Sequence, residues 1–314
     1  MKKKKRTVSS NVSLKNRIWK NRQYYLLILP AVIYVLIFCY APMYGLQIAF
    51  KDYKVIDGIL GSDWAGLEHF MAFFRDPNFE PILWNTIRIS LYSFATFPCS
   101  IIFALMINEL TNHKFKKTVQ MISYMPHFIS TVVVCAMVHM FFNVDGGIVN
   151  NAIVALGGEP VPFMYKAKYF DHLYVWSGVW QGIGWGTIIY LANLSNVSPD
   201  LIEAARIDGA SRWDVVVHIN IPTILPTVVI MLILRVGSIM GVGFEKVFLL
   251  QTDLNLSASR VISTYVYERT LGAGGTTAYW DYSAAIGLFN TFINLILIIL
   301  TNTIARKVSD IALW

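Results

Sequence analysis

Long apolar runs separated by shorter polar segments dominate the pattern of the chain. Six runs have the roughly 20 residues that an α-helix needs to cross the hydrocarbon core of a bilayer. These runs cover residues 24–49, 82–107, 119–142, 172–194, 224–243 and 283–304. Pro98 and Pro126 lie inside two of the runs, but neighbouring helices can satisfy the backbone carbonyls that a proline leaves free. The pattern therefore predicts an all-α, polytopic membrane protein with six transmembrane helices.

The composition supports this class of protein. Of the 314 residues, 55% are hydrophobic and only 14% are charged, and the mean hydropathy is +0.52, which is too apolar for an ordinary soluble domain. The net charge of +7 can point to nucleic acid, but nine Lys and Arg lie before residue 24, directly ahead of the first apolar run. A basic run in that place sets membrane topology and attracts anionic lipid headgroups. We therefore expect membrane lipid, and no nucleic acid, as a partner.

The first apolar run and the distribution of Lys and Arg predict the orientation. The run is longer than the apolar part of a signal peptide and no small-residue cleavage site follows it, which indicates an uncleaved anchor. With the N-terminus inside, the inner segments hold sixteen of the 26 Lys and Arg and the outer segments (51–81, 143–171 and 244–282) hold eight. This bias favours two cytoplasmic termini. We expect a basic cytoplasmic segment (1–23) and a six-helix domain (24–314) in the cell membrane.

One inner segment, residues 195–226, is more elaborate than a connection between two spans needs to be. Ser198, followed by a proline, is typical of a helix start. Gly209 interrupts the helical pattern, because glycine is costly inside a helix and permits a turn. A second short helix then begins at Asp208 or Ser211. The segment is predicted to form a helix–turn–helix that lies across the inner membrane surface.

This segment also carries a specific resemblance. The stretch EAARIDGA at residues 203–210, followed by Ile219, Pro222 and Pro226, resembles the EAA loop of ABC-importer permeases. Its place between the fourth and fifth of six runs extends the resemblance over most of the chain. Val216 stands where an aromatic residue is frequent, which is a mild departure. Stretches such as WNTIRISLYS are similar to sugar-type permeases, particularly those of the oligosaccharide group.

The resemblance implies a mechanical role for the loop as a coupling helix. The loop docks on a separate cytoplasmic ATPase, whose ATP-driven closure then rocks the membrane helices. The residues implied in this docking are Glu203, Ala204, Ala205, Asp208, Gly209, Ala210 and Arg212. Small alanines allow close approach, Glu203 can make a charge-assisted hydrogen bond, and Asp208 can cap the second helix or contact the ATPase. The alternative is an ordinary interfacial helix with Glu203 in solvent.

The resemblance also implies the partners of the chain. A second, homologous permease is expected to complete the pathway, as a heterodimer. Two cytoplasmic ATPase subunits bind ATP and Mg, and an extracytoplasmic solute-binding protein docks on the outer segments. The substrate implied is a carbohydrate, expected to be an oligosaccharide. An ABC permease for a non-sugar solute is the alternative within the family.

Polar side chains inside the apolar runs are candidates for a substrate pathway, because such groups are costly in lipid and face a cavity or another helix. They are Arg235, Asn290, Asn294, Gln181, Trp185 and Tyr190. Arg235 can pair with Glu245 or with a group on another helix. If it reaches the pathway instead, an anionic saccharide such as a uronate oligomer is expected. The asparagines and Trp185 can equally serve helix packing, and Arg88 can extend to the lipid headgroups.

Several activities are excluded or disfavoured by what the sequence lacks. It has no Gly-x-x-x-x-Gly-Lys-Ser/Thr loop for nucleotide phosphates and no His-Glu-x-x-His zinc motif, and its three cysteines lie in apolar runs without metal spacing. We therefore expect no enzymatic activity, metal or cofactor in this chain. An ion-coupled secondary transporter is the remaining rival, but it needs coupling-ion carboxylates in its spans and usually has repeated halves.

Overall fold

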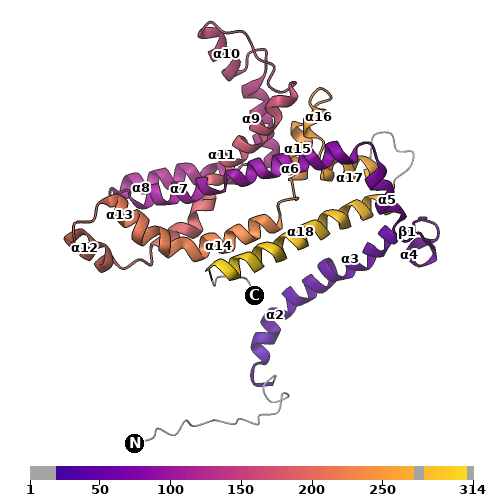
Figure 1. Ribbon diagram of the computed structural model, residues 1–314, viewed down its shortest axis with the longest axis horizontal. Coiled ribbons are helices and arrows are strands. Elements are labelled where there is room, and N and C mark those ends of the chain that lie inside the picture. The colour runs from indigo at the N-terminus through magenta and orange to yellow at the C-terminus, as the bar shows by residue number, and fades with distance from the viewer. Residues whose placement is uncertain (1–18, 272–278, 310–314) are drawn as a thin grey trace, which may run out of the picture.

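The computed structural model describes residues 19–271 and 279–309, and these form a helical protein with one small hairpin (Figure 1). The first half contains α2 (Arg22–Val35), η1 (Leu36–Tyr40), α3 (Ala41–Met43), η2 (Tyr44–Phe50), β1 (Lys51–Asp52), α4 (Gly58–Gly61), β2 (Asp63–Trp64), α5 (Glu68–Arg75), α6 (Phe79–Ala95), α7 (Phe97–Asn108), α8 (His113–Tyr124), η3 (Met125–Phe128), α9 (Thr131–Phe142) and α10 (Ile148–Ala155). The second half contains α11 (Ala167–Leu194), α12 (Pro199–Ile207), α13 (Arg212–Val215), η4 (Val216–Asn220), α14 (Ile221–Gly237), α15 (Phe244–Leu250), α16 (Leu256–Ser259), α17 (Ile262–Leu271) and α18 (Trp280–Ser309). Strands β1 and β2 pair antiparallel. The predicted basic segment 1–23 lies almost entirely outside the described residues.

Four helical segments of the described chain are long and apolar enough to cross a membrane. They are Arg22–Phe50, Phe79–Asn108, Arg212–Gly237 and Trp280–Lys307. They match the first, second, fifth and sixth predicted spans, with ends that differ by several residues. The all-α membrane class is therefore confirmed, and the structure supports four spans, or five if a bent pair of helices counts as one.

The third predicted span, 119–142, is not a single helix. The segments His113–Phe128 and Thr131–Phe142 meet at an angle of 99°. The break has a local cause: Ile129 is extended, with φ −80° and ψ 131°, and the side chain of Ser130 caps the start of α9 by accepting a hydrogen bond from the Val133 N–H. A polar cap at this point stabilises a new helix start, which the apolar pattern alone concealed.

The fourth predicted span corresponds to α11. This helix has 28 residues, enough to cross a bilayer, but it is not among the four most apolar segments because it contains several polar side chains, including Asp171 and Gln181. It lies against α7, and α14 lies against α18 (Figure 1). These helices form the main bundle.

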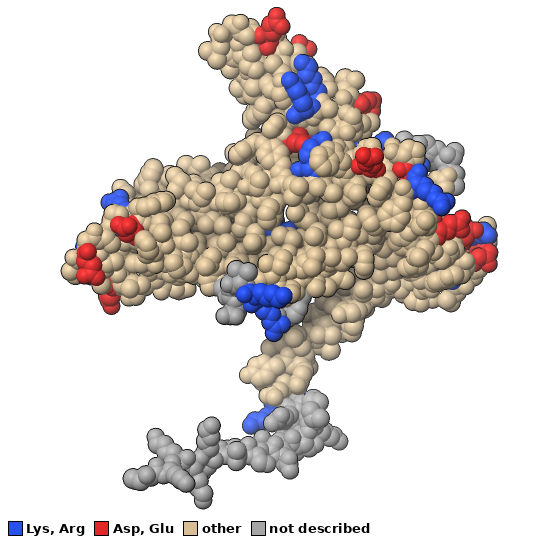
Figure 2. Space-filling model, viewed as in Figure 1, with Lys and Arg blue, Asp and Glu red and all other residues tan. Residues whose placement is uncertain are grey.

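The first apolar segment stands apart from this bundle. Helix α2 has no buried residue, and the apolar part of Arg22–Phe50 is 0% buried, whereas η2 at its far end packs against α18. Figure 1 shows α2 and α3 diverging from the bundle. Figure 2 shows charged side chains mainly toward the ends of the molecule, with broad uncharged faces between them. Such faces suit lipid or another membrane subunit.

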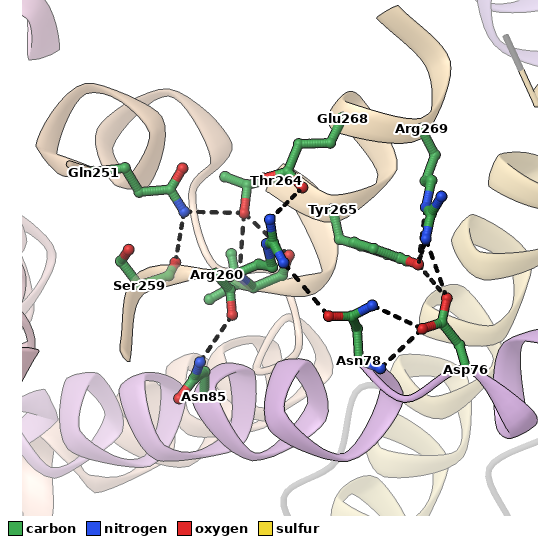
Figure 3. A network of polar contacts seen from close by, with 11 residues as sticks. Asp76, Asn78, Asn85, Gln251, Ser259, Arg260, Thr264, Tyr265, Glu268 and Arg269 are labelled. Carbon is green, nitrogen blue, oxygen red and sulfur yellow. Dashed lines mark hydrogen bonds and ion pairs between the residues drawn. The ribbon is translucent and has the colours of Figure 1, made fainter. Parts of the chain in front are cut away.

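A polar network joins the start of α6 to α17 (Figure 3). Asp76 accepts hydrogen bonds from the hydroxyls of Tyr265 and Tyr282 and from Asn78. Burial by itself raises the pKa of the Asp76 carboxyl, but these hydrogen bonds outweigh it and lower the pKa to about 2. Arg269 lies 3.5 Å from the same carboxylate. The network fixes the loop region around α15–α17 to the bundle.

Candidate functional site

The segment predicted as a helix–turn–helix forms an elbow, defined here as residues 199–215. Helix α12 ends at Ile207 with Asp208 as its C-cap, and Gly209 takes a left-handed φ of +88°, a conformation that favours glycine. The Ala210 N–H donates to the Ala205 carbonyl at 2.9 Å, which closes the helix end in the manner of a Schellman cap. The predicted turn at Gly209 is confirmed, and its geometry depends on that glycine.

The second helix of the elbow starts at Ser211. Its hydroxyl accepts from the Asp214 N–H at 3.2 Å, and the Asp214 carboxylate accepts from the Ser211 N–H at 2.9 Å. This reciprocal capping box holds α13. The capping role considered for Asp208 is therefore wrong, because Asp208 lies at the end of α12.

The elbow presents most of its predicted docking residues to solvent. Glu203, Ala204, Asp208, Gly209 and Arg212 are exposed, whereas Ala205 and Ala210 are half-buried. The sequence interpretation missed two large apolar residues that flank the turn. The exposed fractions are 86% for Ile207 and 71% for Trp213. Apolar side chains this exposed on a short, capped helix pair are typical of an interaction surface. The sequence signal that could have identified them is their position on either side of Gly209, the glycine of EAARIDGA.

The base of the elbow is anchored in the bundle. Val215 and Val216 are buried, and α13 continues through the π-helical turn η4 into α14. The buried Asn220 side chain donates to the Glu109 carboxylate at 3.3 Å, which links the start of α14 to the end of α7. The elbow is therefore joined to α14 through the chain and to the end of α7 through this hydrogen bond.

The bundle contains a half-open cavity of about 590 Å³. Its walls come from the junction of α6 and α7, from one face of α11, from the end of α14 and from the first turn of α15. Gly178 and Gly182 lie four residues apart along that face of α11, so their missing side chains leave this part of the wall open. Gly186, one turn further on, is a packing glycine, because a Cβ there would lie 2.6 Å from the Ser100 hydroxyl oxygen. Gly184, on another face, is packing glycine, because a Cβ there would lie 2.1 Å from the Ser123 carbonyl oxygen.

The chemistry of the cavity is cationic and rich in hydroxyls. Arg235 and Lys246 are among the lining residues, which include no Asp or Glu. Hydroxyl groups of Ser93, Thr96 and Ser100 also line it. Arg235 lies in the last turn of α14. Its guanidinium donates a long hydrogen bond of 3.4 Å to the Ser93 carbonyl. The ion pair between Arg235 and Glu245 that the sequence allowed does not form: it is not among the ion pairs within 4.0 Å in residues 19–271 and 279–309.

Three of the six predicted pathway residues line this cavity, namely Arg235, Gln181 and Tyr190. Gln181 also donates to the Ile129 carbonyl at 2.8 Å, so it satisfies the backbone group left free at the break before α9. Tyr190 is only 3% exposed and packs in an apolar cluster with Leu194 and Ile224. Arg235 is thus the member of the set that is best placed to meet a ligand.

The other three predicted pathway residues lie outside the cavity lining. Trp185 stacks on His127, with ring centroids 4.3 Å apart. Asn294 accepts a hydrogen bond from the Met240 N–H at 3.1 Å, which secures the chain just after α14. Asn290 has a buried side-chain oxygen without a hydrogen-bond partner. Trp185 and Asn294 thus make a ring contact and a backbone contact, and a role of either residue in the pathway stays a prediction.

Arg88 does not extend to the headgroups as the sequence allowed. Its guanidinium donates to both oxygens of Asp171, at 2.6 and 3.1 Å, and to the Ala258 carbonyl at 2.9 Å. The bidentate pair joins α6 to α11, and the third bond reaches α16. Arg88 therefore holds three elements together, because a pair of this geometry is strong and directional.

The chain has no feature of a metal centre in its described part. No three His, Cys, Asp or Glu side chains come together there as metal ligands would. Cys135 is buried in an apolar cluster, and all three cysteines are free. The sites that remain are the elbow and the cavity.

The chain thus forms a helical membrane bundle with a cationic cavity between its helices. An exposed, capped elbow is anchored to two of these helices. This arrangement is that of a membrane transport subunit. The chain belongs to the family of binding-protein-dependent transport system inner membrane components, whose model matches residues 96–310. It is a permease subunit of an ABC importer and not an enzyme. The rival interpretation as an ion-coupled secondary transporter is not supported, because the solved structures that the chain matches are ABC transporters.

Known proteins resemble the chain over nearly its whole length. It is 41% identical over 295 residues to the polygalacturonan/rhamnogalacturonan transport system permease protein YteP of Bacillus subtilis, which covers 94% of this chain and 91% of the relative. Protein LplB of Bacillus subtilis is 39% identical over 302 residues, covering 96% and 94%. The fold matches a chain in the crystal structure of a bacterial alginate ABC transporter in complex with an alginate pentasaccharide-bound periplasmic protein. The TM-score is 0.86 and the identity 36%, over 96% of this chain and 99% of the other.

Proposed function

We propose that the chain forms one half of the translocation pathway for an acidic oligosaccharide. The observation that carries this proposal is the cavity, whose lining contains Arg235, Lys246 and several residues with hydroxyl groups but no Asp or Glu. Cations without a carboxylate partner in a partly desolvated wall favour an anionic ligand, and hydroxyls suit the hydrogen bonds of a sugar. The similar proteins support the same class, because polygalacturonan and alginate are both polymers of uronic acids.

The proposed topology has six spans, with both termini and the elbow in the cytoplasm. Four apolar segments and the bent pair supply five spans, and α11 supplies the sixth, because 28 residues extend about 42 Å as a helix. The excess of Lys and Arg in the inner segments supports this orientation. The elbow then docks on an ATPase subunit through Ile207 and Trp213, with Glu203 and Arg212 at the polar rim.

The proposed assembly contains a second, different permease, two ATPase subunits that bind ATP and Mg, and a solute-binding protein on the outer side. The free-standing apolar helix α2 supports the second permease, because an apolar helix with no buried residue needs a membrane partner or lipid around it. The binding protein docks on the outer segments, which include the network of Figure 3.

Reconstitution into vesicles tests this assembly. Uptake of a uronate oligosaccharide is expected only when the second permease, the ATPase and the binding protein are present together with ATP. A proton or sodium gradient without ATP should give no uptake. Uptake that persists without the ATPase would contradict the coupling role of the elbow.

Replacing Arg235 with glutamine tests the substrate class. Loss of a charge-assisted hydrogen bond to a carboxylate should lower the uptake of an acidic oligosaccharide about tenfold or more, while uptake of a neutral oligosaccharide of equal length changes less than about twofold. Initial uptake rates in vesicles measure both values. Arg75→Gln, at an exposed position in α5 outside the cavity, is the matched control and should leave the ratio of the two rates unchanged. Equal effects of Arg235→Gln on the two sugars would remove the support for an acidic substrate.

A further inference from the structure

We infer that Lys246 is a second carboxylate-binding residue of the pathway and, with Arg235, determines its specificity for acidic chains. The inference rests on the proposed function, because it names the groups that hold that substrate. Lys246 lies in the first turn of α15, in a loop region that the sequence places outside the membrane, yet it lines the same cavity as Arg235. The fold therefore returns this lysine to the cavity between the membrane helices.

The contacts of Lys246 leave its charge largely uncompensated. Its ammonium donates to the Tyr174 carbonyl at 2.8 Å and lies 5.0 Å from the centre of the Tyr174 ring. An ammonium has three donors, and the carbonyl takes one of them. In the described part of the chain, no carboxylate lies within 4.0 Å of it. Carbonyl and ring hold the lysine in position, while the remaining donors are available to a ligand in the cavity.

The wall opposite the lysine is built to leave room for it. A Cβ added at Gly178 would lie 3.1 Å from the Lys246 ammonium nitrogen, which is closer than ordinary contact. Gly178 is one of the two glycines, with Gly182, that leave the α11 wall open. A larger side chain at Gly178 would crowd the ammonium and narrow the approach of a sugar ring.

Two cations on separate elements suit a chain with several carboxylates. Arg235 approaches from α14 and Lys246 from α15, and each is held by a backbone carbonyl rather than by an acid. A substrate carboxylate can therefore replace a weak contact at either place. Two moderate sites bind an anionic chain without trapping it, which a conducting pathway requires.

A comparison of galacturonate oligosaccharides with their methyl esters tests the inference in the complete reconstituted importer. The ester keeps the length and hydroxyl groups and removes the charges. Lys246→Gln is expected to raise the apparent KM for the acid form about tenfold, with less than about a twofold change for the ester. Lys246→Arg should retain most uptake of the acid. The ratio of variant to wild type for each sugar cancels the preference of the binding protein itself.

Lys168 supplies a matched control, because its ammonium also lies over a tyrosine ring, that of Tyr169, at 4.8 Å, but it does not line the cavity. Lys168→Gln should leave the ratio of acid to ester uptake unchanged. Equal losses for acid and ester in Lys246→Gln, or no loss for either, would overturn the inference and leave Lys246 as a brace between α15 and α11. If the wild-type importer takes up only the ester, the proposed acidic substrate itself fails.

A second variant covers the case in which Lys246→Gln does not assemble with its ATPase. Gly178→Ala keeps the charge but crowds the ammonium, and co-purification of the ATPase reports its assembly. It is expected to lower uptake of the acid form severalfold and to spare the ester. An assembled Gly178→Ala importer that treats both sugars as the wild type does would also overturn the inference.

Discussion

Replacing Gly209 with proline is expected to abolish transport while ATP hydrolysis and membrane insertion persist. Gly209 has a φ of +88°, and proline fixes φ near −65°, so the backbone between α12 and α13 must rearrange. The substitution also removes the hydrogen bond from the Gly209 N–H to the Arg206 carbonyl. In the proposed coupling role, the rearranged elbow no longer passes the motion of the ATPase to α14. Sugar imported per ATP hydrolysed should fall at least about tenfold, because a misplaced mechanical contact affects the coupled step rather than the folding of the bundle.

Gly157 offers a closely matched control for this experiment. It follows α10, has a φ of +86°, and donates its N–H to the carbonyl three residues earlier, as Gly209 does. A Cβ at either glycine would meet no atom within 4 Å. Gly157→Pro therefore imposes the same backbone strain far from the elbow and should leave the ratio of sugar to ATP near the wild-type value. If the two variants behave alike, the elbow is not the coupling element.

The sequence predicted the parts of the fold that depend on local pattern. Apolar length located α6–α7, α14 and α18, and a glycine between two short helices located the elbow. The break at Ile129 was not predicted, because its free carbonyl is satisfied by Gln181, which lies 52 positions away. A proline and a serine in an apolar run are compatible with both a straight and a broken helix until that partner is known.

The cavity was only partly predictable for the same reason. Arg235 stands out in an apolar run, so the sequence identified it. Lys246 lies in a segment counted as an outer loop, and its role depends on the return of α15 toward Tyr174, 72 positions away. Trp185 and Asn294 carry the right chemistry for a sugar, but their neighbours in the fold take up that chemistry in packing. Residue type therefore limits the candidates, and only the tertiary contacts select among them.

Replacing Arg88 with methionine is expected to be the most destabilising single change in the bundle. The substitution leaves the Asp171 carboxylate, whose side chain is 16% exposed, without its bidentate partner, and it removes the bond to the Ala258 carbonyl. An uncompensated, largely buried charge costs about 3 kcal/mol or more. The purified complex should therefore unfold at a clearly lower temperature than the wild type, as measured by thermal denaturation in detergent.

Two further variants separate the possible causes of this loss. Arg75→Met removes an exposed arginine at the end of α5 and should leave the unfolding temperature unchanged. Arg88→Met combined with Asp171→Leu should recover much of the lost stability, because no unpaired carboxylate remains and an apolar pair can replace an ion pair of similar volume. A double variant no more stable than Arg88→Met alone would assign the loss to packing around α16. A single variant as stable as Arg75→Met would mean that the ion pair contributes nothing, and that Arg88 is free to turn toward the lipid headgroups.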